Sequence, residues 1–205
     1  MKRIVLATHN EDKFCELKTI LQPHGYALIS MSETGFTGDI AETGNSYREN
    51  AYIKAKTLYD FCQCPVLADD TGLSIDLLDG APGLHTARFA GIESSYADKI
   101  EAIWKLLQPY PRDQWTATFH CELCYIDGDV HYFSGQIKGL ILDEKKGSNG
   151  FGYDPVFYIP ELGVTTAEML PEEKNKISHR GRALAKFVRF LNNESLLLEQ
   201  YDEER

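Results

Sequence analysis

The order of apolar and polar positions predicts a chain in which helices and strands alternate before a long hairpin. Apolar residues recur every three or four positions in the helical segments, whereas the strand segments show apolar runs or alternation. We predict strands over residues 3–7, 26–30, 65–68, 73–78, 115–126, 130–137 and 156–159, and helices over residues 11–21, 46–61, 95–107 and 178–191. This order indicates an α/β fold with a mixed sheet flanked by helices.

Polar residues mark the predicted helix starts. Asn10 and Ser178 stand where an N-cap belongs, and Ser46-x-x-Glu49 has the pattern of a capping box. No internal repeat or long linker divides the chain. We therefore expect one domain over residues 1–205, with a frayed tail after about residue 195.

The composition limits the classes of partner. Acidic residues outnumber basic residues by 31 to 21, which gives a net charge of −10. A protein that binds duplex nucleic acid would carry a basic stripe, so we expect no nucleic-acid partner. No apolar run approaches the roughly 18 residues of a membrane span, so we expect no membrane partner. The apolar run at the N-terminus is too short for a signal peptide, which favours a cytoplasmic protein.

The cysteines suggest neither a disulfide framework nor a metal site. There are five of them, an odd number, and disulfides are rare in the reducing compartment expected here. Cys62-x-Cys64 and Cys121-x-x-Cys124 have spacings that could suggest zinc. A strand, however, places residues three apart on opposite faces, so Cys121 and Cys124 would not share an ion. We expect ordinary buried thiols.

The segment Thr8-His9-Asn10-Glu11-Asp12-Lys13 leaves a predicted strand and enters a helix. The free N–H groups of such a helix start attract phosphate. Lys13 lies in the first turn, where a cation opposes the helix dipole unless an anion is bound. The alternative is a capped helix with a solvated lysine.

Ser178-His179-Arg180 places basic side chains at another helix start, with Lys174 and Lys176 just upstream. The alternative here is a solvated basic patch. Two helix starts loaded with cations in one acidic protein nevertheless favour a shared anion site.

Asp69-Asp70-Thr71-Gly72 follows an apolar segment, at what we expect to be a strand end. Adjacent carboxylates repel one another unless a cation or a proton lies nearby. Magnesium takes one or two carboxylates together with phosphate oxygens, and a carboxylate can also accept a proton from attacking water. Glu42, in an acidic loop, is a candidate third carboxylate. The alternative is a turn capped by Asp69 with Asp70 in solvent.

Gly150-Phe151-Gly152-Tyr153-Asp154-Pro155 contains glycines that let the backbone approach a ligand closely. Phe151 offers a ring for base stacking, which is worth about 1–3 kcal/mol in single-strand nucleic-acid sites. Asp154 and backbone groups could read a base edge. The alternative is a tight loop whose aromatic side chains fill the core.

Together these segments resemble the Ham1-like family, the inosine/xanthosine triphosphate pyrophosphatases. The similarity runs from Arg3 to about Leu191, and the combined order and spacing of the motifs is specific although no single motif is. The matching motifs are Thr8-x-Asn10-x-x-Lys13, Glu42-Thr43-Gly44, Asn50-Ala51-x-x-Lys54-Ala55, Ala68-Asp69-Asp70-Thr71-Gly72-Leu73, Gly80-Ala81-Pro82-Gly83, Ala87-Arg88, Phe151-Gly152-Tyr153-Asp154-Pro155 and Lys174-x-x-x-Ser178-His179-Arg180-Gly181.

The resemblance implies an elongated, two-lobed single domain with a strongly twisted mixed sheet, an active site in the cleft between the lobes, and a homodimer. It also implies magnesium-dependent hydrolysis of the purine nucleoside triphosphates ITP, dITP and XTP to the monophosphate and pyrophosphate. This reaction clears deaminated purine nucleotides before polymerases use them. Selecting a 6-keto purine needs donors aimed at O6, because the amino group of ATP would leave such donors unpaired. Arg180, a backbone N–H near Tyr153, or both could supply them.

Carried over by position, the resemblance assigns expected roles. Asp70 is the expected catalytic proton acceptor, and it is expected to bind Mg²⁺ together with Glu42. The expected substrate contacts are Thr8, His9, Asn10, Glu11, Asp12, Lys13, Thr71, Phe151, Gly152, Tyr153, Asp154, Lys174, His179 and Arg180.

Two positions depart from the family pattern. His9 stands where many relatives have glycine, which would narrow the phosphate cradle. Ala41 stands where some relatives have a second acid, which leaves Glu42 as the only local acid for a metal.

Three rival functions stay open at this point. A Maf-like nucleotide pyrophosphatase would open with an S-x-S-P-R-like turn, which Thr8-His9-Asn10 does not match. A non-catalytic nucleotide-binding regulator would be expected to lack Asp69 and Asp70. A phosphatase would release orthophosphate instead of pyrophosphate.

Overall fold

The computed structural model describes residues 2–86, 88–91 and 94–203, with side chains described as far as residue 193. Ala87, which belongs to one matching motif, lies outside the described residues. The described strands are β1 (Lys2–Leu6), β2 (Tyr26–Ser30), β3 (Val66–Ile75), β4 (Thr116–Asp127), β5 (Asp129–Ile141), β6 (Phe157–Ile159) and β7 (Val164–Thr165). The described α-helices are α1 (Glu11–Leu21), α2 (Tyr47–Cys62), α3 (Tyr96–Leu107), α4 (Pro171–Ile177) and α5 (His179–Glu203).

The seven strands form one mixed sheet in the order β2-β1-β3-β4-β5-β6-β7. β1 runs parallel to β2 and β3, and each later neighbouring pair is antiparallel. Parallel neighbours need a crossover connection, which α1 supplies between β1 and β2. The predicted α/β fold with a mixed sheet flanked by helices is confirmed.

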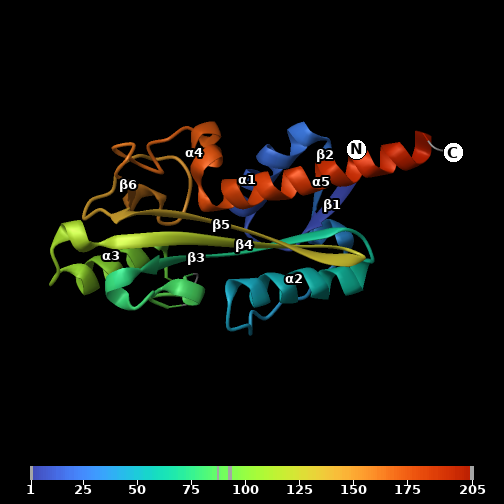
Figure 1. The fold of residues 1–205 in the computed structure, drawn as a ribbon. Helices are drawn as coiled ribbons and strands as arrows, with labels where there is room; N and C mark the ends of the chain where they lie inside the picture. The colour runs from blue at the N-terminus through green and yellow to red at the C-terminus, as the bar shows by residue number, and fades with distance from the viewer. Residues whose placement is uncertain (1, 87, 92–93, 204–205) are drawn as a thin grey trace.

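The strand register makes the molecule elongated and two-lobed. β1 pairs with β3 only at Val66 and Leu67, near the start of β3. β6 pairs with β5 at Leu140 and Ile141, and Leu140 lies opposite Thr116 at the start of β4. Because β3 and β4 are antiparallel, the start of β4 lies beside the end of β3. The short strands β1 and β2 therefore extend the sheet at one end of the long strands, and β6 and β7 extend it at the other end. The long strands β3, β4 and β5 run between the two lobes (Figure 1).

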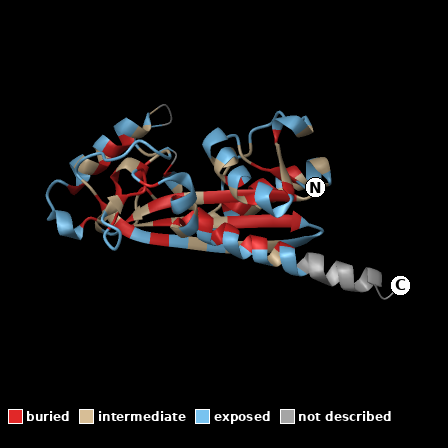
Figure 2. Ribbon diagram, turned by 90° about the horizontal axis from the view of Figure 1, so that it is seen from above, coloured by how far each residue is buried: buried red, intermediate tan, exposed pale blue. Residues whose placement is uncertain are grey.

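Three clusters of buried side chains form the core. One lies in the lobe that contains β6, where α3 packs against the long strands through residues such as Ile103. In the lobe that contains β1, α1 and α5 cover one face of the sheet through residues such as Leu17 and Phe187. α2 covers the opposite face through residues such as Leu58. Buried residues accordingly follow the strands and the inner sides of the helices (Figure 2).

β3 is longer than the sequence predicts. It does not stop at Ala68 but continues through Asp69 and Asp70 to Ile75, and all 10 of its residues pair with β4. The expected strand end is therefore wrong, because β4 supplies a hydrogen-bonding partner that the polar stretch does not reveal. What ends near Leu67 is the pairing with β1. Successive side chains of a strand point to opposite faces, so the two adjacent carboxylates diverge.

Other boundaries also differ from the predicted ones. β5 continues past Ile137 to Ile141, and the short elements β7 and α4 were not predicted. The backbone of the last helix stays helical through Glu203 instead of ending at Leu191. No glycine or proline occurs between residues 192 and 203, so no residue there interrupts the helix.

The predicted helix caps are present. Asn10 and Ser178 each accept a hydrogen bond from a first-turn N–H group, at 2.9 and 3.0 Å. Ser46 accepts one from the Glu49 N–H at 3.1 Å. The Glu49 carboxylate, however, accepts from the N–H of Asn45 and not from that of Ser46, so the predicted capping box is only half formed.

The five cysteines are free thiols that differ in how far they are buried. Cys121 and Cys124 belong to buried clusters on opposite faces of the sheet, as predicted. The expectation of buried thiols is wrong for Cys15, which is exposed, and Cys62 and Cys64 are only half-buried. Across residues 2–86, 88–91 and 94–203, no helix has the length and apolar character needed to cross a membrane.

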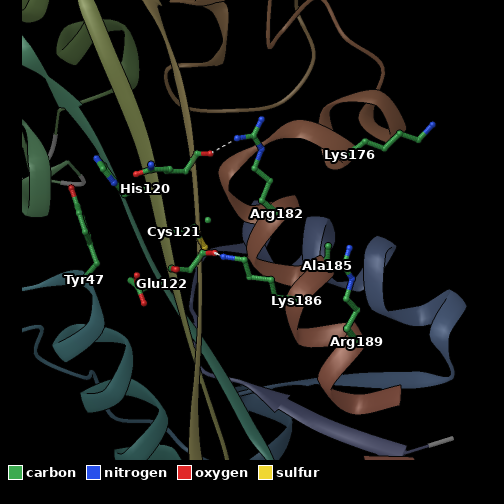
Figure 3. A pocket seen from close by; sticks show the side chains of 12 residues that line it. Tyr47, His120, Cys121, Glu122, Lys176, Arg182, Ala185, Lys186 and Arg189 are labelled. Atoms are coloured by element: carbon green, nitrogen blue, oxygen red, sulfur yellow. Dashed lines mark hydrogen bonds between the residues drawn. The ribbon is translucent and has the colours of Figure 1, made fainter. Parts of the chain in front are cut away.

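The outer edge of β5 fixes the position of α5. Arg182 and Lys186 donate hydrogen bonds to backbone carbonyls of β5, at 2.9 and 2.7 Å (Figure 3). Between these contacts lies Gly135, where a Cβ atom would collide with the carbonyl oxygen of His179. The absence of a side chain at this residue therefore lets the first turn of α5 approach the sheet.

We expect Gly135→Ala to destabilise the protein by about 1–3 kcal/mol, the usual cost of overpacking a tight contact. Urea denaturation measures the change, and Ser134→Ala at the neighbouring exposed position is the matched control. Equal stability of the two variants would show that α5 does not depend on this close approach.

Candidate active site

A cleft of about 560 Å³ opens beside the middle of β3, beyond its short pairing with β1. Its walls come from the start of α1, the loop over residues 39–43, β3, and Leu84, Thr86, Arg88 and Tyr96 of the other lobe. Seven predicted site residues are among its described lining: Thr8, His9, Asn10, Lys13, Glu42, Asp70 and Thr71. Three of the stretches that we expected to act together, those of Lys13, Glu42 and Asp70, therefore converge here.

The start of α1 presents a cation and the positive end of the helix dipole to the cleft. The Asn10 N–H donates to Thr8 Oγ1 at 3.2 Å, and the Asn10 side chain accepts from the Lys13 N–H at 2.9 Å. These bonds fix the turn that precedes the helix. The Lys13 ammonium reaches across to Asp69, with Nζ and Oδ2 3.0 Å apart.

Asp69 is fully buried between two helix starts that carry cations. Its Oδ2 accepts hydrogen bonds from Arg180 Nη2 at 3.2 Å and Thr71 Oγ1 at 3.0 Å, in addition to the Lys13 contact. Burial alone would raise the pKa of Asp69, but Lys13 and Arg180 outweigh burial and hold that pKa well below its usual range. Oδ1 has no hydrogen-bond partner within the described part of the chain. Asp69 is therefore a permanent anion at neutral pH.

Asp70 points to the other face of β3 and meets α2. Asn50 Nδ2 donates to Asp70 Oδ2 at 3.1 Å, and Lys54 Nζ donates to Asp70 Oδ1 at 3.3 Å. Lys54 also donates to Glu42 Oε1 at 2.7 Å. Burial raises the pKa of Asp70. The positive charge of Lys54 acts in the opposite direction, and the negative charge of Glu42 raises this pKa further. A carboxylate with a raised pKa on the wall of a cleft is suited to accept a proton.

Glu42 and Asp70 are the residues that fit a magnesium ion. Both carboxylates contact the same ammonium group of Lys54, so they face the same space. Asn50 Oδ1 accepts from the Gly44 N–H at 2.8 Å and thus ties the loop of Glu42 to Asp70. Nowhere in the described chain do three or more His, Cys, Asp or Glu side chains cluster to hold a metal. Magnesium commonly uses one or two carboxylates plus water and phosphate oxygens, which this pair allows.

A second hollow of about 260 Å³ opens between α1, residues 149–151 and α4. Asp12, Phe151 and Lys174 are among its described lining. Lys174 Nζ lies 5.2 Å and the Arg180 guanidinium 5.7 Å from the centroid of the Phe151 ring. An aromatic face next to cations is a suitable surface for a nucleotide base.

The buried carboxylate of Asp154 shapes this second hollow. Its Oδ2 accepts from Lys174 Nζ at 2.7 Å and from the Phe151 N–H at 2.8 Å, and its Oδ1 accepts from Thr166 Oγ1 at 2.8 Å. Both oxygens therefore hold protein groups in place. Tyr153 is also buried.

Gly152 and Glu11 are two further residues that we predicted to contact the substrate, and Gly152 is half-buried whereas Glu11 is exposed. Gly152 has a left-handed backbone, with φ of 71°, and lies against the ring of Tyr96. Glu11 is exposed and is not among the described residues that line the cleft. The roles of both remain predictions.

Arg180 is buried behind the two hollows and contacts residues that line each of them. Its Nη1 contacts the carboxylate of Glu16, while its Nη2 reaches Thr71 Oγ1 at 3.3 Å on the cleft side. Glu16 Oε1 also lies 3.4 Å from Lys174 Nζ. Burial would lower the pKa of Arg180, but Glu16 and Asp69 raise it above its usual value. Lys13 and Asp70 therefore line one cleft, and Arg180 lies directly behind Thr71 in its wall.

His179 is buried beside Arg180 and stacks on Phe119, with ring centroids 4.7 Å apart. Its Nδ1 has no hydrogen-bond partner in the described structure. Burial, reinforced by Arg180 and Lys174, lowers the pKa of His179 well below its usual value. The imidazole is therefore neutral at pH 7.

The sequence analysis gave no role to three residues that complete the site, Asn50, Lys54 and Glu16. Asn50 and Lys54 are four residues apart, on the buried side of α2 that also carries Ala51 and Ala55. An amide and an ammonium within an apolar helical stripe are the signal that could have revealed them. Glu16 follows Lys13 by three residues and so shares its side of α1.

A larger hollow, of about 610 Å³, lies apart from these residues, at the outer edge of β5 (Figure 3). Its described lining includes Tyr47, His120 and Arg189, and none of the predicted site residues. Size alone therefore does not identify the candidate site in this molecule.

The free energy of unfolding should fall as the pH is lowered from about 6.5 to 5, by up to about 1.4 kcal/mol per pH unit for His179. The sign follows because the unfolded histidine binds a proton in this range while the buried one does not. His179→Phe, which keeps the ring, should reduce the slope in denaturation curves recorded across this range. A residual slope is expected from His120, whose pKa burial also lowers. An unchanged slope in the variant would contradict this account.

Known proteins resemble this chain along most of its length. A sequence model of the Ham1 family matches residues 4–190. The chain is 41% identical to a dITP/XTP pyrophosphatase of Bacillus licheniformis, covering 94% of this chain and 99% of the relative. It is 43% identical to a dITP/XTP pyrophosphatase of Halalkalibacterium halodurans, and the match covers 94% of this chain and 100% of that relative.

Solved structures agree with the sequence comparisons. A HAM1 protein from Coxiella burnetii superposes with a TM-score of 0.84 at 38% identity, covering 94% of this chain and 100% of that structure. The Ham1 protein of Staphylococcus aureus gives a TM-score of 0.84 at 37% identity, with the same coverage. With its fold, its converging motifs and these likenesses, the chain belongs to the Ham1 family.

Proposed function

We propose that this chain hydrolyses the deaminated purine nucleotides dITP, XTP and ITP to the monophosphate and pyrophosphate. The observation that carries the proposal is the cleft in which Lys13 and Lys54 face Asp70 and Glu42. Cations bind a polyphosphate there, and a carboxylate stands ready to take a proton. The names of the relatives at 41% and 43% identity support the same reaction and substrates.

Asp70 is the proposed proton acceptor. Its raised pKa and its position on the cleft wall suit it to take a proton from the water that attacks the α-phosphorus. Asn50 and Lys54 hold its two oxygens, so the carboxylate is already oriented before substrate arrives. Asp69 does not compete for this role, because its paired oxygen is held by Lys13 and Arg180 and its pKa is lowered.

Charge must be balanced as pyrophosphate leaves. Lys13 and the helix start that Thr8 and Asn10 shape are the proposed contacts of the triphosphate, because positive groups there stabilise the growing negative charge. Magnesium, held by Glu42 and Asp70, would add Lewis-acid stabilisation of that charge when bound. Lys54 contacts both carboxylates and balances their charge in the free protein.

The second hollow is the proposed base site. Phe151 would stack on the purine, and Asp154 keeps Phe151 and Lys174 in position. Selectivity for a 6-keto purine needs a donor aimed at O6, for which Arg180 and a backbone N–H near Tyr153 are the candidates. Arg180 is engaged by Glu16 and Asp69 in the free protein, so binding the base would exchange one set of hydrogen bonds for another.

We also propose that the chain works as a homodimer in the cytoplasm. The family resemblance supports the dimer. The five free cysteines are compatible with a reducing compartment.

A substrate panel with product analysis tests the function. With magnesium, ITP, dITP and XTP should yield pyrophosphate, whereas ATP, GTP and dTTP should react far more slowly. Chelation of the metal should abolish turnover. Asp70→Asn should lower kcat by about 10²–10⁴-fold, the usual contribution of a general base, while ITP still binds in calorimetry.

The matched control for this variant is Asp60→Asn, at an exposed carboxylate near the end of α2, which should keep full activity. Orthophosphate as the product would instead favour a phosphatase. Binding without any turnover of the wild-type protein would favour a regulator. Full activity of Asp70→Asn would remove Asp70 from the chemistry.

A further inference from the structure

A pair of thiols lies at the junction between α2 and β3, at the end of α2 away from its substrate-site residues. Cys62 is the last residue of α2, and Cys64 precedes the strand by two residues. Both are half-buried and pack against the cluster of apolar side chains beneath α2. Cys15 is exposed, and the remaining two cysteines are buried inside the sheet. Nothing in the proposed hydrolysis uses these two sulfurs.

The backbone between the two cysteines turns their side chains toward one another. Gln63 adopts a left-handed conformation, with φ of 49°, which is uncommon for a residue with a Cβ atom. Its N–H closes the helix on the carbonyl of Tyr59 at 2.8 Å, so the turn is fixed by the helix end. The Cys64 thiol donates to the Cys62 sulfur, with the two Sγ atoms 2.7 Å apart. Convergence of the side chains is a geometric requirement for a disulfide, and the two sulfurs converge here.

The same spacing argues against a metal site. Two thiolates on one zinc ion lie roughly 3.7 Å apart, given Zn–S bonds of about 2.3 Å in a tetrahedron. The observed separation is shorter, and no group of three or more metal-binding side chains occurs in the described part of the chain. A bond of about 2.05 Å between the sulfurs is closer to the observed arrangement.

We propose that Cys62 and Cys64 form a dithiol that low-molecular-weight disulfides oxidise reversibly to an intramolecular disulfide. The Cys62 thiolate attacks one sulfur of a compound such as oxidised glutathione and expels the first glutathione thiolate. Cys64 then loses its proton and attacks the Cys62 sulfur of the mixed disulfide, expelling the second glutathione. The two cysteines lose two electrons and two protons in total, and one glutathione disulfide becomes two thiols.

The environment gives the two thiols different roles. The Cys64 thiol contacts the Cys62 sulfur and is the one whose proton is engaged within the pair. Burial and the neighbouring Cys62 raise the pKa of Cys64 to about 12, so Cys64 acts second, once the mixed disulfide places a sulfur beside it. Lys54 lies eight residues before Cys62, about 12 Å along the helix, so the disulfide would form away from the Asp70 contacts.

The test incubates the whole protein with oxidised glutathione, alkylates the remaining thiols and maps the peptides by mass spectrometry. The single peptide that carries both Cys62 and Cys64 should resist alkylation, lack a glutathione adduct and show a loss of two hydrogen atoms that dithiothreitol reverses. The exposed single thiol of Cys15 is an internal control and should carry a glutathione adduct instead.

The variants Cys62→Ser and Cys64→Ser remove one partner each. In Cys64→Ser, the adduct on Cys62 should persist, because no second thiol displaces it. In Cys62→Ser, Cys64 should react several-fold more slowly than Cys62 does in the other variant. The proposal is overturned if Cys62 and Cys64 of the wild-type protein are both still alkylated when Cys15 is fully modified by glutathione. It is also overturned if these two cysteines accumulate glutathione adducts or form a disulfide between two chains.

Discussion

The site depends on one buried carboxylate that neutralises cations from two helix starts. Asp69 lies in the middle of β3, with no exposed surface, and meets Lys13 from α1 and Arg180 from α5. A cation in the first turn of a helix opposes the helix dipole, so each of these side chains would be unfavourable without an anion. Leaving a buried charge unpaired costs several kcal/mol, so the three groups stabilise one another only as a set. Their arrangement also brings α1, β3 and α5 together at the cleft.

The two adjacent aspartates can serve different purposes because they lie within a strand. Asp69 faces the cations and has a lowered pKa, whereas Asp70 faces Asn50 and Lys54 and has a raised pKa. One carboxylate therefore maintains the geometry of the phosphate site while the other can exchange a proton. In a turn, the alternative that the sequence left open, Asp69 would cap the backbone and Asp70 would lie in solvent. The pairing of β3 with β4 is thus as important for the chemistry as the side chains themselves.

Much of this arrangement could be predicted from the sequence, but only where the signal is local. Asn10 and Ser178 cap their helices as expected, because capping needs only residues within one turn. The continuity of β3 could not be read from its own polar residues, since it depends on β4, which is distant in sequence. For the same reason Glu16 was missed and Asn50, although part of a matching motif, was given no role, because their importance comes from contacts with Arg180 and Asp70 that only the fold creates.

The most direct test of the role of Asp69 is a double-mutant cycle for unfolding that combines Lys13→Gln with Asp69→Asn. Asp69→Asn keeps the shape of the side chain, Lys13→Gln keeps a polar side chain that is one atom shorter, and both remove the charge. We expect a coupling energy of about 1–3 kcal/mol between the two positions, because Asp69 is buried and Lys13 nearly so. The exposed pair Lys56 and Asp60, measured in the same way, is the comparison and should couple several-fold more weakly. A coupling between Lys13 and Asp69 no larger than that of the exposed pair would contradict the account.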